Sequence, residues 1–196
     1  MRCSAVLLAG GKSTRMGRDK AFLEFGGQPL WRRQLEVLQE LAPEQLMIAG
    51  SAREEWSRYE VIADEAAEAG PLAGVVAALA RCTAPLLVVL AVDLPMMTAA
   101  FLRSLLESCN EEQGVVPTSS SGLEPLAAIY PRACAALAVA SLKTVDVSMR
   151  SFARHALEQG SVREHEIAPD NLELFANLNT PADYDKSRQR PIHPAR

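Results

Sequence analysis

The stretch Leu8-Ala9-Gly10-Gly11-Lys12-Ser13-Thr14-Arg15-Met16-Gly17-Arg18-Asp19-Lys20 decides the fold, because a glycine-rich basic loop follows a buried strand there. The apolar run before the loop predicts a first strand over Ala5–Ala9. In an open α/β sheet, ligands bind beyond the carboxyl ends of the strands, which is where Gly10 and Gly11 lie. Paired glycines let backbone N–H groups approach an anion closely, so the loop predicts a cradle for a polyphosphate. Four cations fall within nine residues of this loop: Lys12, Arg15, Arg18 and Lys20.

The loop matches neither of two well-known phosphate motifs. A Walker A loop needs a glycine five positions before Gly11, and Val6 stands there. A Rossmann fingerprint needs the spacing G-x-G-x-x-G, which Gly10, Gly11 and Gly17 do not provide. The alternative is a glycine-rich turn with a solvated basic face. The coincidence of strand, glycines and clustered bases favours a phosphate site instead.

The rest of the chain alternates short apolar runs with segments of helical periodicity. This pattern predicts an α/β fold with a single domain, in which a mostly parallel open sheet carries helices on both faces. We expect the domain to span residues 1–185, and residues 186–196 to form a basic, disordered C-terminal tail. The expected strands are Ala5–Ala9, Leu46–Ala49, Glu60–Ala63, Leu86–Val92, Val115–Val116 and Leu126–Tyr130, and the expected helices are Pro29–Leu41, Gly70–Arg81, one capped by Thr98, Arg132–Leu142, Ser148–Gln159 and one starting at Thr180.

Composition excludes several classes of function. With 48% hydrophobic and 22% charged residues, the chain can bury a full core, which argues against disorder. The aromatic content is only 5% and the formal net charge is −4, so we expect no nucleic-acid binding. The tail Lys186–Arg196 holds four basic residues and no acidic one, so the remainder is more acidic still. No run approaches the ~20 apolar residues of a membrane span, and we expect no membrane association.

The cysteines lie far apart in the sequence and form no CxxC pair, which makes a zinc site improbable. Free thiols that act as small apolar residues fit a reducing compartment. We therefore expect a cytoplasmic protein with four unpaired cysteines: Cys3, Cys82, Cys109 and Cys134.

A second candidate site residue is Asp93, which follows the longest apolar run of the chain, Leu86–Val92. A carboxylate at this strand end points into the same crevice as the glycine loop. Carboxylates in such positions commonly hold Mg²⁺, which polyphosphate substrates need. The alternative is an aspartate that only begins a turn before Pro95. Asp64 ends the third expected strand in the same way.

At this point the sequence resembles the molybdenum cofactor guanylyltransferases, the MobA-like branch of the nucleotidyltransferases with a Rossmann-like fold. The resemblance covers about residues 4–185. Leu8-Ala9-Gly10-Gly11, in place of an L-A-A-G form, is more similar to the guanylyl branch than to the molybdopterin cytidylyl branch. The segments that carry the resemblance are the glycine loop, Asp64–Gly74, Asp93-Leu94-Pro95 and Phe175–Pro181, in that order.

The resemblance implies a role for each matching residue. Asp93 would be the metal ligand, and Arg15 and Lys20 would act with it in catalysis. The resemblance departs at Ile48-Ala49-Gly50-Ser51, where some members carry an asparagine that lines the nucleotide site. The expected contacts are Leu8, Ala9, Gly10 and Gly11 along the nucleotide, Lys20 at its phosphates, Asp64 near the nucleoside, and Asn177 and Asn179 on the pterin or phosphate side.

The implied reaction is the transfer of GMP from GTP to the phosphate of Mo-molybdopterin, with Mg²⁺ as cofactor and pyrophosphate as the second product. The implied partners are GTP, Mo-molybdopterin, and a molybdoenzyme chaperone or apoenzyme. Another nucleotidyltransferase of the same fold, acting on cytidylyl or sugar-phosphate substrates, is the first alternative. A GTP-binding module that delivers cofactor without catalysis is the second.

Two further positions bear on the second substrate. Glu124 precedes an expected strand and either borders that substrate or begins an edge strand, a place that suits Pro125. Arg150 lies near the start of an expected helix, where a surface arginine is the simpler interpretation than a contact with the pterin phosphate.

Overall fold

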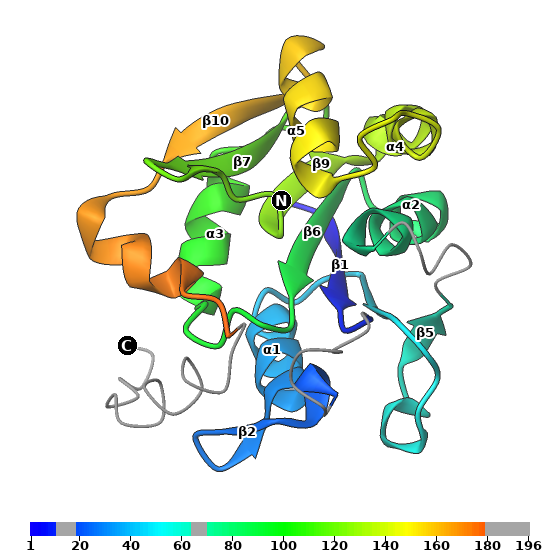
Figure 1. The fold of residues 1–196 in the computed structure, drawn as a ribbon, viewed down its shortest axis with the longest axis vertical. Coiled ribbons are helices and arrows are strands. Elements are labelled where there is room, and N and C mark those ends of the chain that lie inside the picture. Colours follow the sequence, from blue (N-terminus) through cyan, green and yellow to red (C-terminus); the bar gives the residue numbers. More distant parts are fainter. Residues whose placement is uncertain (11–18, 64–69, 179–196) are drawn as a thin grey trace.

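The computed structural model describes residues 1–10, 19–63 and 70–178. These residues form an eight-stranded sheet with helices on both faces, beside a two-stranded hairpin (Figure 1). Strand β8 stands outside the strand order and pairs with the last residues of β7, Thr118 and Ser119. In spatial order the other strands are β10 (Val162–Glu166), β7 (Gly114–Ser119), β9 (Ala127–Pro131), β6 (Leu86–Ala91), β1 (Cys3–Leu8), β4 (Gln45–Ala49) and β5 (Glu60–Ile62), and β8 is Gly122–Leu123.

The strand directions bring most carboxyl ends to one edge of the sheet. The central strand β1 is parallel to β4 and β6, with Leu8 opposite Ala49 on one side and Ala91 on the other. Strand β9 is antiparallel to both β6 and β7, so β6 and β7 run in the same direction. Strand β10 is parallel to β7. The predicted mostly parallel sheet is therefore confirmed, with β9 and β8 as its antiparallel members.

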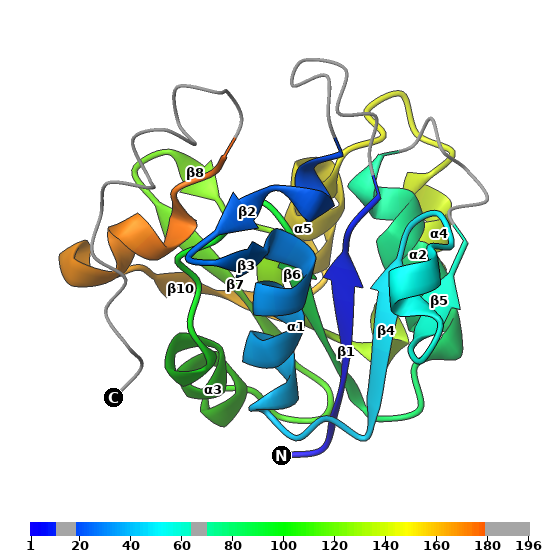
Figure 2. The same ribbon diagram turned by 90° about the horizontal axis from the view of Figure 1, so that it is seen from below.

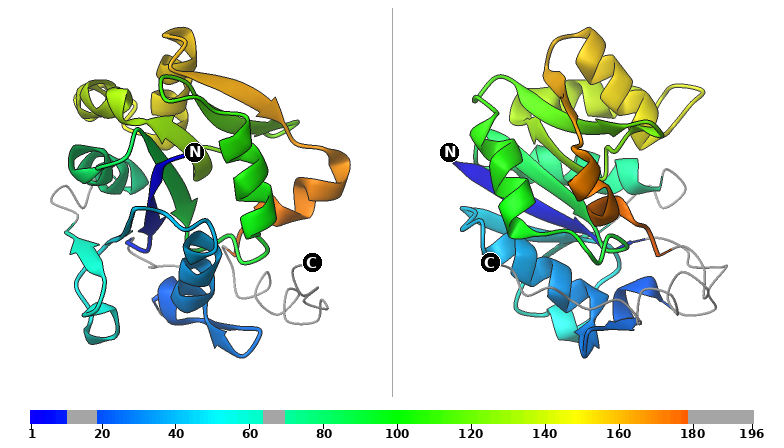
Figure 3. Two further views of the ribbon diagram at one scale, coloured as in Figure 1. Left: turned by 180° about the vertical axis from the view of Figure 1, so that it is seen from behind. Right: turned by 90° about the vertical axis from the view of Figure 1, so that its left-hand side faces the viewer.

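The helices form one layer on each face of the sheet, as predicted. Adjacent side chains of β1 point to opposite faces of the sheet. Leu7 packs in the core between the sheet and one helix layer, and Leu8 packs in the core between the sheet and the other layer. Both residues are buried, which is why the strand reads as a continuous apolar run. Figures 2 and 3 show the two layers from other sides. One layer holds α1 (Leu30–Gln39) and α3 (Ala99–Glu107), and the other holds α2 (Pro71–Arg81), α4 (Ala135–Ser141) and α5 (Met149–Glu158).

Two helices begin at a hydroxyl cap, of which the one at Thr98 was predicted. The hydroxyl of Thr98 accepts a hydrogen bond from the Phe101 amide at 3.2 Å, and Ser148 does the same for Ser151 at 3.2 Å. Each hydroxyl satisfies an amide that has no partner within its helix. Pro29 precedes α1 as its N-cap instead of standing within the first turn, so that helix begins one residue later than expected.

The elements that the sequence does not predict are short or polar. Strand β10 has a single buried residue at its edge position, Val162, so it carries no apolar run. Its polar character suits an edge strand, whose second side meets solvent. The hairpin of β2 (Glu24–Phe25) and β3 (Gln28–Pro29) turns at Gly26-Gly27, a glycine pair that is a usable hairpin signal.

Other limits shift by a few residues. Strand β1 starts at Cys3 instead of Ala5, and β7 extends through Ser119, because its last residues pair with β8. The segment predicted as one helix from Arg132 begins as the 3₁₀ turn η4 (Arg132–Cys134) and continues as α4. Two more 3₁₀ segments were not predicted, η2 (Glu54–Trp56) and η5 (Pro169–Phe175). The helix start at Thr180 and the basic tail lie outside the described residues.

All four cysteines are free and buried, which confirms the prediction that they act as core residues. Burial raises the pKa of Cys109 to about 12 and the pKa of Cys134 to about 11. Thiols with such pKa values hold little reactive thiolate near neutral pH. No helix among the described residues is long and apolar enough to cross a membrane.

Gly114 allows β7 and β9 to approach closely, and we expect Gly114→Ala to destabilise the fold strongly. A Cβ at this position would lie 2.0 Å from the carbonyl oxygen of Ile129, which belongs to the backbone and cannot turn away. The free energy of unfolding should fall by about 3 kcal/mol, which lowers Tm by roughly 6–12 °C in a protein of this size. Thermal melts measure it, with Gly160→Ala as the control, since a Cβ there meets open space and only the φ of +70° opposes it. A loss for Gly114→Ala no larger than the control's would contradict the described strand contact.

Candidate active site

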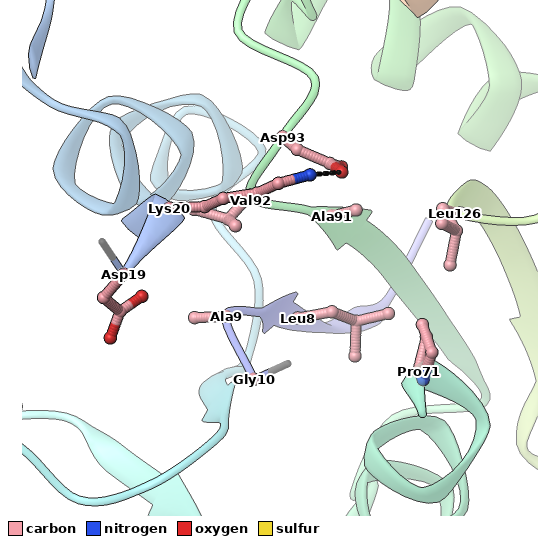
Figure 4. Close-up of a pocket in the computed structure, with 10 residues that line it drawn as sticks. All are labelled: Leu8, Ala9, Gly10, Asp19, Lys20, Pro71, Ala91, Val92, Asp93 and Leu126. Atoms are coloured by element: carbon pink, nitrogen blue, oxygen red, sulfur yellow. Dashed lines mark hydrogen bonds and ion pairs between the residues drawn. The ribbon is translucent and has the colours of Figure 1, made fainter. Parts of the chain in front are cut away.

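An open cleft of about 210 Å³ lies at the carboxyl edge of the sheet, where β1 and β6 end (Figure 4). Lys20 and Asp93 face each other across one side of it, with the Lys20 Nζ donating to the Asp93 Oδ2 at 3.3 Å. Their side chains are each about one-fifth exposed, so both charges remain accessible from the cleft. The lining residues are Leu8, Ala9, Gly10, Asp19, Lys20, Pro71, Ala91, Val92, Asp93 and Leu126.

Lys20 is held in place by the short helix that it begins. This 3₁₀ turn, η1 (Lys20–Phe22), is capped by Asp19, whose Oδ1 accepts a hydrogen bond from the Ala21 amide at 3.1 Å. Ala21 is fully buried, and the Phe22 ring stacks on Trp56 with centroids 5.9 Å apart. The backbone under Lys20 is therefore anchored on the protein core, while the amine reaches into the cleft.

Asp93 lies in a turn that three separate segments hold. The amide of Val92 donates to the Leu8 carbonyl at 3.1 Å, and the amide of Leu178 donates to the Asp93 carbonyl at 3.0 Å. From α1, the buried Gln34 side chain donates to the carbonyl of Leu94. This bonding fixes the carboxylate beside the ends of β1 and β6. The second carboxylate oxygen, Oδ1, is buried and has no hydrogen-bond partner among the described residues.

The described part of the glycine loop uses its backbone differently from the expectation. The amides of Ala9 and Gly10 both donate to the Ala49 carbonyl, each at 2.9 Å. The Gly10 N–H is thus engaged within the sheet edge and is not offered to an anion, so the expectation of a phosphate cradle is corrected at this residue. Gly10 is exposed and presents its open surface to the cleft instead.

Gly50 lies in the stretch at the end of β4, Ile48-Ala49-Gly50-Ser51, which contains no asparagine. A Cβ there would lie 3.1 Å from the Gly10 nitrogen, tighter than an ordinary contact. Glycine therefore lets the loop after β4 pack directly against the backbone of Ala9 and Gly10. No side chain extends from this point into the cleft.

The other wall of the cleft is the start of α2. Pro71 begins this helix and lines the cleft, with Gly70 as N-cap. Further along the helix, a Cβ on Gly74 would lie 2.9 Å from the Ala49 Cβ and 3.1 Å from the Leu8 side chain. The small residue lets α2 sit close to β1 and β4. The start of the helix, where the helix dipole favours negative charge, is thereby held at the cleft.

The structure brings together five of the predicted site residues and leaves others outside its description. Leu8, Ala9, Gly10, Lys20 and Asp93 all line the cleft. Asn177 is exposed and does not line the cleft, although its neighbour Leu178 bonds directly to Asp93. Four predicted residues lie outside the described part of the chain: Gly11, Arg15, Asp64 and Asn179.

Several site residues were missed by sequence reasoning. Gln34 and Arg33 on α1 hold the turn after Asp93, with the Arg33 Nε donating to the Pro95 carbonyl at 2.7 Å. Burial lowers the pKa of Arg33, which is packed over the Phe25 ring. The sequence signal that could have found them is the polar pair Arg33-Gln34 among the apolar residues that α1 buries. Asp19 was also missed as a lining residue, although it stands directly before Lys20.

We expect Arg53→Ala to lower kcat/KM for nucleotide, because the substitution removes contacts that support η1. The Arg53 Nη2 donates to the Asp19 Oδ2 at 2.8 Å, and its guanidinium lies 5.9 Å from the centroid of the Phe22 ring. Arg53 therefore contacts the residue directly before Lys20 and the residue two positions after it. The value of kcat/KM for nucleotide should fall roughly three- to tenfold, a modest effect because the ion pair is partly exposed.

Steady-state kinetics of Arg53→Ala and Arg58→Ala provide the comparison. Arg58 also lies over an aromatic ring of this cluster, that of Tyr59 at 5.0 Å, but it forms no ion pair with Asp19 in the described structure. Equal losses in both variants would show that Arg53 acts through general stability and not through the Lys20 segment.

The described lining of the cleft contains no serine, cysteine, threonine or histidine that could attack a substrate. Among the described residues, no group of three or more acidic, histidine or cysteine side chains could hold a metal ion by itself. What the cleft offers is a cation, a carboxylate and a helix start, which suit binding and charge neutralisation. Transfer between two substrates, one of which supplies its own nucleophile, fits such a site.

The fold is an open α/β sheet, and the cleft lies at the carboxyl edge of that sheet, where proteins of this class commonly bind their ligands. The family described as "MobA-like NTP transferase domain" matches residues 5–162. The chain belongs to this family and is a nucleotidyltransferase.

Individual relatives agree with this assignment. The chain is 39% identical over 192 residues, 95% of each sequence, to a protein of Opitutus terrae named probable molybdenum cofactor guanylyltransferase. A protein of the same name from Pelotomaculum thermopropionicum is 31% identical, with 96% of this chain and 93% of the relative covered. Among solved structures, molybdopterin-guanine dinucleotide biosynthesis protein A from Archaeoglobus fulgidus shares the fold, with a TM-score of 0.74 and 24% identity over 95% of this chain and 97% of that one.

Proposed function

We propose that the protein transfers GMP from GTP to the phosphate of Mo-molybdopterin, forming the guanine dinucleotide cofactor and releasing pyrophosphate. The observation that carries this proposal is the Lys20–Asp93 pair in the cleft of a MobA-like NTP transferase chain. The choice of guanylyl transfer rests on the relatives named molybdenum cofactor guanylyltransferase.

The reaction needs no covalent intermediate with the protein. An oxygen of the acceptor phosphate attacks the α-phosphorus of GTP, and the bond from that phosphorus to the oxygen bridging to the β-phosphate breaks. Pyrophosphate leaves with that oxygen. The enzyme must align two anions and reduce their repulsion, which are the main contributions of protein to such transfers. Lys20, a compact charge that lines the cleft, would stabilise the leaving pyrophosphate.

The residues present fit a Mg²⁺ ion. Within the part of the chain that the structure describes, the buried Asp93 Oδ1 lacks a hydrogen-bond partner, an arrangement that is costly unless a cation or donor completes it. Mg²⁺ is usually bound by one or two carboxylates with water and substrate phosphates, so a full cage of protein ligands is not needed. Asp93 would hold the ion, which when bound would neutralise charge on the phosphates. Arg15 would assist Lys20 at the triphosphate.

The remaining expectations follow from the same reaction. Leu8, Ala9 and Gly10 would contact the nucleotide along one wall, with Asp64 near the nucleoside and Asn177 and Asn179 toward the acceptor. Buried free cysteines support a reducing cytoplasm as the location. A molybdoenzyme chaperone or apoenzyme would receive the product.

A panel of nucleotides tests the proposal. With Mo-molybdopterin and Mg²⁺, pyrophosphate release should be at least roughly a hundredfold faster with GTP than with ATP, CTP or UTP, because a site that pairs with the guanine edge leaves polar groups unpaired with other bases. Equal turnover with CTP would move the protein to the cytidylyl branch. GTP binding without pyrophosphate release would indicate a delivery module, which the Lys20–Asp93 pair argues against.

A further inference from the structure

Helix α1 supports the segment that carries Lys20. The amide of Leu30, the first residue of the helix, donates to the Leu23 carbonyl at 2.9 Å, directly after the η1 turn. The ring of Trp31 packs against the ring of Phe22 in η1, with centroids 6.5 Å apart. The first two residues of α1 are therefore joined to the turn from which the Lys20 amine reaches into the cleft.

The next residues of the same helix support the segment that follows Asp93. The Arg33 Nε donates to the Pro95 carbonyl at 2.7 Å, and the Gln34 Nε2 donates to the Leu94 carbonyl. The two charged residues of the cleft stand 73 positions apart in the chain, yet one helix supports both. Helix α1 is thus a common rigid element that fixes their separation.

The packing of the fold does not explain why residue 34 is a glutamine. Gln34 is fully buried among the apolar side chains of α1. Its Nε2 has the Leu94 carbonyl as partner, but its Oε1 is buried and has none among the described residues. An unpaired buried polar atom is costly, and an apolar side chain of the same length would fill this space without that cost. The amide is therefore explained by what it holds in place.

Buried polar atoms without a partner gather around this support. Among the residues that the structure describes, they are Trp31 Nε1, Trp56 Nε1, Gln34 Oε1 and Asp93 Oδ1. Both tryptophan rings pack against Phe22 of η1. Native proteins accept such costs mainly at functional sites, where they keep a geometry that stability alone would not select. The region from η1 to the Asp93 turn therefore has the character of a support for the site.

The chemistry of the cleft makes the position of Asp93 important. Its carboxylate can serve a metal-bound triphosphate only if it stands at the correct distance from the phosphates that Lys20 contacts. A displacement of about 1 Å in such a site can reduce the rate by roughly 10². Side chains that orient a metal ligand from outside typically change metal affinity or activity by about 10- to 100-fold. Gln34 is such a side chain, since it contacts the turn of Asp93 and does not line the cleft.

We propose that Gln34 is a positioning residue of this enzyme. Through the Leu94 carbonyl it holds the Asp93 carboxylate where this group and Lys20 act on one triphosphate. The inference rests on the proposed function and deepens it. It assigns the coupling between metal and nucleotide to a buried residue that contacts neither.

Equilibrium dialysis of GTP with Gln34→Met tests this role without turnover, because no acceptor is present. Methionine keeps the length of the side chain and removes both polar atoms. With EDTA, the Kd for GTP should equal that of the wild type. Mg²⁺ should tighten GTP binding by the wild type, and this gain should be roughly tenfold smaller in the variant. Tm should change by less than about 4 °C, because removal of the unpaired Oε1 offsets the lost bond to Leu94.

Steady-state kinetics with Mo-molybdopterin provide a second readout. For Gln34→Met, kcat should fall about tenfold and the Mg²⁺ concentration at half-maximal rate should rise, while the KM for the acceptor changes less than threefold. In the background of Asp93→Asn, the same substitution should cause no further loss, because its effect passes through that carboxylate. Losses that multiply would show a merely structural role and overturn the proposal.

Arg103→Ala is the matched control on the same helix. The Arg103 Nη2 donates to the Glu40 carbonyl at 2.8 Å, so it supports the far end of α1 and not the turn of Asp93. All values for this variant should equal those of the wild type. Losses in Gln34→Met no larger than the control's, or an unchanged effect of Mg²⁺ on GTP binding, would overturn the positioning role. A wild type that binds GTP in a Mg²⁺-dependent way but releases no pyrophosphate with acceptor would overturn the proposed function instead.

Discussion

Asp93→Asn is expected to lower kcat by on the order of 10² or more while the protein stays folded. The substitution keeps the shape of the side chain but removes the charge that would hold a cation against the triphosphate. Residues 1–10, 19–63 and 70–178 supply no hydrogen-bond partner to the buried Oδ1, and the backbone of Asp93 is held independently through Val92 and Leu178. The chemistry should therefore fail before the fold does.

A Mg²⁺ titration of pyrophosphate release measures this effect in the wild type and in Asp93→Asn, beside thermal melts of both. The wild type should need the metal, and the variant should need more of it and reach a lower plateau. Asp146→Asn is the control, since Asp146 is an exposed aspartate that does not line the cleft. A variant with wild-type rate and metal dependence would make Asp93 a turn residue only.

Lys20→Ala should reduce kcat/KM for GTP by about 10², through both weaker binding and slower transfer. Its amine lies in the cleft within hydrogen-bond distance of Asp93, where it can contact phosphate in the bound substrate and in the transition state. Lys20→Arg should recover part of the rate, because it restores the charge but not the compact ammonium. The measurement is steady-state kinetics over a range of GTP concentrations.

A double-mutant cycle with Asp93→Asn separates the two possible roles of Lys20. If Lys20 and Asp93 act on the same phosphates, the double variant should lose less than the product of the single losses. Multiplicative losses would mean that the two residues act independently. A Lys20→Ala enzyme with unchanged kcat/KM would remove Lys20 from the site altogether.

The sequence predicted the candidate site best where a residue of the cleft directly follows a buried strand. The apolar run before Asp93 predicted both β6 and the position of the carboxylate, because parallel strands end at a common edge. The same logic located Leu8, Ala9 and Gly10. Lys20 was found through its charge, although the 3₁₀ turn that holds it was not predicted.

What the sequence could not give is the bonding between distant segments. The sequence of the glycine loop does not show that the Gly10 amide donates a hydrogen bond to the Ala49 carbonyl, because that bond depends on the register of β1 and β4. The support of the Asp93 turn by Gln34 is equally non-local. Strand β10 was not predicted because it buries one side chain only. It therefore lacks the alternation of apolar and polar residues by which a strand is recognised in a sequence.

The central position of β1 has a consequence for how the chain is made and unfolds. Strand β1 lies in the middle of the finished sheet, and its partners β4 and β6 follow it in the chain, so they are synthesised tens of residues later. One side of Cys3–Leu8 can pair once β4 is made, but the other side lacks its partner until β6, which ends at residue 91, is available. Such long-range pairing makes folding slow and leaves the nascent chain prone to aggregation. In the native protein, the amides of the edge strands β5 and β10 should exchange with solvent first, and those of the central strand β1 should exchange last.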